Sequence, residues 1–171
     1  MTPDSAARRI VNVLIAAFAL AFVGILALAA YFDASIRVLH LFESIPFLAS
    51  AALCLRGRKT GYALGVAASA FLLLCSAVLT TFVRNGFERV TMLLRTGHVD
   101  RPDVLLGAFA GTFTAGLLIF SLWGYLKLPN KSWRDLGLFA GQIGLVVCFF
   151  LTIFAVFAPQ YLAMFKPLMG K

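Results

Sequence analysis

The stretch VLLGAFAGTFTAGLLIFSLWGYL, residues 104–126, contains no charged side chain. A hydrocarbon core of about 30 Å is crossed by about 20 helical residues, because each residue of an α-helix rises about 1.5 Å. Every backbone N–H and C=O group inside lipid must be paired within the protein, and the stretch lacks the alternating pattern of a barrel strand. The sequence therefore predicts a transmembrane α-helix here.

Four further runs share this apolar character, and the complete set of predicted spans is 10–32, 36–55, 61–83, 104–126 and 136–158. The chain of 171 residues is 61% hydrophobic and 13% charged, whereas a soluble domain carries about 25% charged residues. A soluble fold of this size has no core large enough for that apolar surface. We predict an all-α integral membrane protein, a five-transmembrane-helix bundle in which residues 1–171 form a single membrane domain.

The first run resembles a cleavable signal peptide in two respects. Arg8 and Arg9 precede it, and small residues gather near its end in LALAA, residues 26–30. Its apolar length of about 20 residues nevertheless exceeds the 7–15 residues of a signal-peptide core. We expect it to be retained as the first span, with cleavage as the alternative.

The basic residues indicate an orientation. If all five segments span, one side of the membrane receives eight of them: Arg8, Arg9, Arg56, Arg58, Lys59, Lys127, Lys131 and Arg134. Short loops rich in Lys and Arg stay in the cytoplasm. We therefore expect a multi-pass protein of the cell membrane, in the bacterial inner membrane, with the N-terminus cytoplasmic and the C-terminus outside; the inverted orientation is the alternative. The net charge of +8 is scattered among these loops, which argues against nucleic acid as a partner.

The outer loop 84–103 is the longest connection. Its apolar residues alternate with arginines in the pattern of a short helix lying among lipid headgroups: Phe87, Val90, Met92, Leu93 and Leu94, with Arg89 and Arg95. Asp103 stands just before the fourth span, where an N-cap is expected.

Small residues spaced four apart allow transmembrane helices to approach closely. The predicted packing glycines are Gly61, Gly65, Gly107, Gly111, Gly137 and Gly141. The third and fifth spans run in the same direction, which brings their glycine pairs to a similar depth. We predict that these two pairs contact each other or form an interface with another subunit.

Three ionisable residues interrupt the second span, in IRVLHLFESIPFL, residues 36–48. Arg37, His40 and Glu43 are spaced by three and share one inclined stripe of a helix. The segment crosses the membrane only if it extends back through Glu43, which places the carboxylate below the surface. A charge at that depth costs at least about 3 kcal/mol, so Glu43 should be protonated, paired or in a wet cavity.

Candidate partners for Glu43 are His40, Arg37, and Arg84 and Arg89 of the outer loop. Pro46 cannot donate a hydrogen bond to the carbonyl of Phe42, so a kink is expected beside the carboxylate.

Three interpretations of this stripe remain open. The first is an outward-facing pocket in which Glu43 binds a proton, a cation or a cationic solute and His40 tunes it. The second is a cluster of Arg37, His40 and Glu43 at the membrane rim that orients the helix and touches no ligand. The third is a segment that lies at the interface without spanning.

Other chemistry is sparse. Cys54, Cys75 and Cys148 stand singly in apolar segments, and we expect them to be buried packing thiols. His98 lies in the outer loop and His40 near the rim, so no pair of histidines suits a haem, and we expect neither a cofactor nor a metal.

The leading functional expectation is a small non-enzymatic accessory or self-associating subunit, in contact with the lipid bilayer and with a membrane-protein partner or a second copy of itself. The alternative is a small carrier or ligand-binding protein that uses Glu43. A membrane enzyme ranks third, because too few reactive groups converge.

Overall fold

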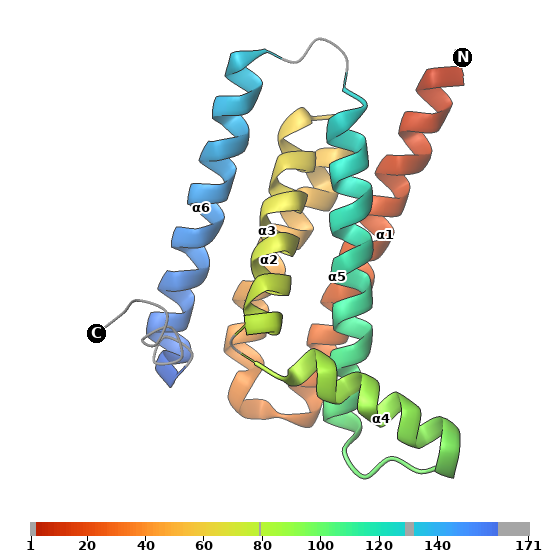
Figure 1. Cartoon of the computed structure of the whole chain (residues 1–171). Coiled ribbons are helices and arrows are strands. Elements are labelled where there is room, and N and C mark those ends of the chain that lie inside the picture. Colours follow the sequence, from red (N-terminus) through yellow and green to blue (C-terminus); the bar gives the residue numbers. More distant parts are fainter. Residues whose placement is uncertain (1–2, 79, 129–131, 161–171) are drawn as a thin grey trace.

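The computed structural model describes residues 3–78, 80–128 and 132–160, and every regular element in these ranges is a helix (Figure 1). Five helices are long and apolar enough to cross a membrane. They are α1 (Pro3–Phe32), α2 (Arg37–Leu55), α3 (Lys59–Val78), α5 (Pro102–Leu126) and α6 (Trp133–Phe157). The prediction of an all-helical bundle with five membrane-spanning helices is confirmed.

The connections gather at the two ends of the bundle (Figure 1). The start of α1, the α2–α3 turn and the start of α6 share one end, where Lys59 lies 3.4 Å from Asp135. This is the end on which the basic residues were expected to meet, although Lys131 lies outside the described ranges. The opposite end carries the α1–α2 turn, α4 (Phe82–Thr96) and the end of α6.

A short 3-10 turn, η1 (Ala34–Ile36), links α1 to α2. Asp33 caps it, because its carboxylate accepts hydrogen bonds from the backbone N–H of Ser35 at 2.9 Å and from the Ser35 hydroxyl at 2.6 Å. These two bonds stabilise the ionised form and hold the pKa of Asp33 below its ordinary value. The chain therefore reverses direction within four residues.

The third span ends earlier than the sequence predicted. α3 stops at Val78, whereas the prediction extended it to Val83. The backbone N–H of Thr80 donates to the carbonyl of Cys75 at 3.2 Å, a bond typical of a helix end, and the following apolar residues begin α4 instead. The apolar run at 82–83 is continuous with the span in sequence but changes direction in space.

The start of the fourth span also differs. α5 begins at Pro102, whose fixed φ and missing N–H suit the first position of a helix. Arg101 is therefore the N-cap residue, and the prediction that Asp103 caps this helix is wrong. The Asp103 carboxylate instead accepts from the guanidinium of Arg101 at 2.7 Å.

The short helix expected in the outer loop is present as α4. It projects beyond α5 at one end of the bundle (Figure 1), and Gly97 ends it with a left-handed φ of +68°. Gly86 touches α5 so closely that an added Cβ would lie 2.3 Å from the backbone nitrogen of Ala108. α4 is thus seated directly on the backbone of α5. Its place among lipid headgroups stays a prediction.

Aromatic contacts tie the long helices together. The rings of Phe22 and Phe47 lie 4.4 Å apart between α1 and α2, and those of Phe71 and Phe150 lie 5.0 Å apart between α3 and α6. α3 is central, since 56% of its apolar stretch is buried inside the protein, whereas 22% of the apolar stretch of α6 is buried. α6 therefore packs at the edge of the bundle.

The glycines of α3 pack against α2 and α5. A Cβ on Gly61 would meet the backbone nitrogen of Cys54 at 2.6 Å, and one on Gly65 would meet the hydroxyl oxygens of Ser121 and Ser50. The predicted contact between these glycines and those of α6 is therefore wrong.

The glycines of α6 behave differently. Gly137 and Gly141 have no atom within 4 Å of an added Cβ. Their alternative role, an interface with another subunit, stays a prediction. Cys148 is also exposed on this helix, while Cys54 and Cys75 are buried. The expectation of burial is wrong for Cys148 because α6 presents only one side to the bundle.

Candidate functional site

His40 and Glu43 form a pair on α2. Nδ1 of His40 lies 2.6 Å from Oε2 of Glu43, and the two side chains are 16% and 10% exposed. A heavy-atom separation this short requires a proton between the two atoms, donated by either the imidazole or the carboxyl group. The carboxylate within the predicted membrane depth therefore has its partner one turn away on the same helix.

Arg37 does not join this pair. Its guanidinium donates to the carbonyl of Ala30 in α1 at 3.5 Å, a long hydrogen bond, and the side chain is exposed. The predicted cluster thus divides into a largely buried His40–Glu43 pair and a separate arginine at the start of α2.

The outer-loop arginines are engaged elsewhere. Nε of Arg84 lies 3.2 Å from Oε1 of Glu88, and Nη1 of Arg89 lies 2.9 Å from Oδ1 of Asp100. Both were possible partners for Glu43, and that expectation is wrong. Each arginine is neutralised by a nearby residue of its own loop.

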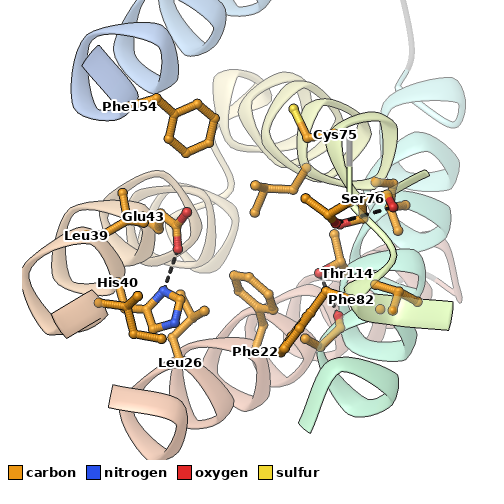
Figure 2. A pocket seen from close by; sticks show the side chains of 17 residues that line it. Phe22, Leu26, Leu39, His40, Glu43, Cys75, Ser76, Phe82, Thr114 and Phe154 are labelled. Atoms are coloured by element: carbon orange, nitrogen blue, oxygen red, sulfur yellow. Dashed lines mark hydrogen bonds and ion pairs between the residues drawn. The ribbon is translucent and has the colours of Figure 1, made fainter. Parts of the chain in front are cut away.

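The pair faces a cavity of about 180 Å³. An engineered protein cavity of about 150 Å³ binds benzene, so this one has room for a ligand with a single ring. All six α-helices of the described chain contribute to its wall. The residues labelled in Figure 2 are Phe22, Leu26, Leu39, His40, Glu43, Cys75, Ser76, Phe82, Thr114 and Phe154.

The side of the cavity opposite the His40–Glu43 pair carries hydroxyl groups (Figure 2). Thr114 donates its proton to the carbonyl of Ala110 at 2.7 Å, and Thr80 donates to the carbonyl of Ser76 at 3.5 Å. A hydroxyl whose proton is engaged in this way retains lone pairs that accept hydrogen bonds. The cavity therefore combines apolar walls with hydrogen-bond acceptors on two sides.

α4 supplies part of the wall through Phe82 and Val83. The ring of Phe82 lies where a Cβ on Gly107 would fall, and the side chain of Val83 lies where a Cβ on Gly111 would fall. Gly107 and Gly111 thus let α4 approach α5 and close this side of the cavity.

Several of these residues were missed by sequence reasoning. Phe82 falls within the predicted third span, and nothing in the sequence distinguishes Ser76 and Thr114 from other polar residues of the apolar runs. The Gly107 and Gly111 pair was a usable signal, because it marked a close contact whose partner was unknown. A uniformly apolar sequence does not indicate which face of each helix packs toward α2.

Pro46 is buried in α2, which runs as a single helix from Arg37 to Leu55. A kink at this position stays a prediction. The hydroxyl of Ser44 donates to the carbonyl of Leu41 at 2.6 Å, so a local side chain satisfies one carbonyl in this stretch.

Within the described ranges, no group of three or more His, Cys, Asp and Glu side chains is arranged to hold a metal ion. The chain matches no protein-family model, no curated protein and no solved structure. The inference of function therefore rests on the geometry of the cavity.

Proposed function

We propose that this chain is a membrane protein that binds a small, mostly apolar solute carrying one basic nitrogen, in the manner of a carrier or receptor. The observation that supports this most strongly is the largely buried His40–Glu43 pair on the wall of a ring-sized cavity. A carboxyl group at membrane depth is costly unless it performs a function or is well paired. Here it is paired by one neighbour and still borders open space.

Charge complementarity favours a basic ligand. Oε2 of Glu43 is engaged by His40, whereas Oε1 receives no hydrogen bond from the described residues. An ammonium group offers donors and no acceptor, which suits this oxygen and the acceptor lone pairs of Thr114. The apolar part of such a ligand would lie against Phe22 and Phe154.

The test is a melting series on the purified protein in mild detergent. Benzylamine should raise the melting temperature, and toluene, of similar shape but without nitrogen, should raise it less. Glu43→Gln should abolish the difference between the two compounds. Glu88→Gln is the matched control, because Glu88 is exposed at the same end of the bundle. An identical response of wild type and Glu43→Gln would refute the proposal.

The second candidate function is that of an accessory or self-associating subunit. The face of α6 that carries Gly137, Gly141 and Gly144 supports it, because no atom of the described chain lies within 4 Å of a Cβ added there. The glycines of α3, in contrast, already pack against α2 and α5. Native mass spectrometry in mild detergent tests this alternative. An oligomer that Gly141→Leu converts to a monomer supports association, whereas a monomeric wild type means that α6 faces lipid.

We also propose a bacterial inner-membrane location with the N-terminus in the cytoplasm. The basic residues of the α2–α3 turn and of the loop before α6 support this orientation. A reporter enzyme that is active only in the cytoplasm, fused at Arg58 and in the outer loop at Gly97, would be active at the first position alone. The reverse result would establish the inverted orientation.

A further inference from the structure

A second hollow lies on the outer surface of the bundle between α1 and α2, and we call it the α1–α2 groove. Its walls include Ala27 and Tyr31 from α1 and Arg37, Leu41 and Ser44 from α2. It shares Leu26 and His40 with the cavity but extends along the outside of the two helices.

Arg37 marks one end of this groove. Three other arginines at this end of the bundle form ion pairs: Arg84 with Glu88, Arg89 with Asp100 and Arg101 with Asp103. Arg37 has no carboxylate within 4 Å among the described residues, and its hydrogen bond to Ala30 is long. Most of its five N–H donors therefore remain available to an external anion.

The position of Arg37 sets the depth of the site. It is the first residue of α2, directly after the turn, so its guanidinium lies where a spanning helix meets the headgroup layer. Tyr31 is 78% exposed at the same level, and tyrosine is enriched at this interface. If α2 spans as its length and composition indicate, the polar end of the groove is expected at the polar layer of the bilayer.

The remainder of the groove runs toward the membrane interior. From Arg37 to Ser44 the axial distance is about 10 Å at the rise of an α-helix. Ala27 is exposed, and its small side chain leaves the groove open along α1. Leu41, which is 65% exposed, borders the groove on the α2 side. A hollow of this kind in the hydrocarbon layer is bordered by lipid chains, so its apolar part is suited to one of them.

We propose that the α1–α2 groove binds an anionic phospholipid, with the phosphate at Arg37 and an acyl chain along Ala27 and Leu41. A guanidinium fork matches the geometry of phosphate oxygens and binds them through charge-assisted hydrogen bonds. A zwitterionic lipid carries a cation that competes for the same phosphate, so anionic lipid should bind more tightly. This site does not depend on the proposed function of the cavity.

The test is lipid retention in native mass spectrometry of the full chain, with phosphatidylglycerol and phosphatidylcholine of identical acyl chains. Wild type should retain phosphatidylglycerol in preference. Arg37→Gln should weaken this retention about tenfold, the factor that corresponds to the loss of one charge-assisted hydrogen bond. Arg95→Gln is the control, because Arg95 is exposed at the same end and forms no ion pair among the described residues.

A second variant tests the apolar part of the α1–α2 groove. Ala27→Phe fills the groove without touching the core, and it should reduce retention of phosphatidylglycerol while Arg37 is intact. Glycerol phosphate, which lacks acyl chains, should not protect the protein against thermal unfolding. The proposal is overturned if Arg37→Gln retains phosphatidylglycerol like wild type, if Arg95→Gln loses as much, or if Ala27→Phe has no effect. The proposal is also overturned if glycerol phosphate protects the protein against thermal unfolding as well as phosphatidylglycerol does, because the groove would then be a surface site for anions.

Discussion

At the residue scale, the central feature is one proton held between an imidazole and a carboxyl group. The 2.6 Å separation of His40 and Glu43 leaves each group dependent on the other, since both side chains are largely buried. Removing one partner from a buried pair leaves the other without compensation, and this costs more than removing both. The pair can therefore be tested by substitutions made singly and together.

His40→Leu should lower the free energy of unfolding by about 3 kcal/mol, the usual consequence of leaving one member of a buried pair alone. The double variant His40→Leu with Glu43→Leu should recover most of that loss, because no unpaired polar group remains. Denaturant unfolding of the purified variants provides the measurement. A double variant whose loss equals the sum of the two single losses would show that the two groups are not coupled.

Packing at glycine allows a second prediction at this scale. Gly65→Ala places a methyl group 2.4 Å from the hydroxyl oxygen of Ser121, and overpacking of this kind costs about 1–3 kcal/mol. Gly141→Ala meets nothing within 4 Å and should be neutral or slightly stabilising in the monomer, because alanine is the better helix former. Equal stability of the two variants would contradict the packing described for α3.

At the scale of elements, α4 connects the outer loop to the cavity. It is seated through Gly86 on the backbone of α5, and its first turn closes the cavity with Phe82 and Val83. The sequence predicted a helix in this loop but not its role, because Phe82 and Val83 follow the apolar run of α3 with no charged residue between them. The boundary depends on a change of direction after Val78 that hydropathy does not record.

Displacing α4 should expose the cavity. Gly86→Leu clashes with the backbone of α5 at Ala108, so α4 should move away and Cys75, which borders the cavity, should react faster with N-ethylmaleimide. Mass spectrometry of the modified peptides would measure a several-fold increase at Cys75. Gly24→Leu is the control, since nothing lies within 4 Å of that glycine. Unchanged labelling in Gly86→Leu would mean that α4 does not cover the cavity.

At the scale of the whole molecule, hydrophobic length determines the number of spans, and the arrangement of helices determines the site. Five spans were predictable because a run of about 20 apolar residues has few other stable environments. The neighbours of each helix were not predictable, since lipid-facing and protein-facing positions are equally apolar. Gly137 and Gly141 have the same spacing as Gly107 and Gly111, yet only the latter pair packs within the chain.

The pairing of His40 with Glu43 was accessible from the sequence, because a spacing of three places both on one helix face. The cavity beside them was not, because Ser76, Thr114 and Phe154 come from three other helices. The separation of Arg37 from the pair likewise depends on α1, whose carbonyl at Ala30 receives the guanidinium. The pairing of residues on one helix was thus predictable from the sequence. The contacts between residues of different helices could be found only from the structure.

Recognition of a basic ligand by Glu43 is tested by calorimetric titration of benzylamine into the purified protein in mild detergent, for wild type, Glu43→Gln and Glu88→Gln. We expect saturable binding of one molecule per chain to wild type and to Glu88→Gln, and affinity at least about tenfold weaker for Glu43→Gln, as for a lost charge-assisted hydrogen bond. Equal affinity of wild type and Glu43→Gln, or no saturable binding to either, would contradict the claim that the buried carboxyl group recognises a basic ligand.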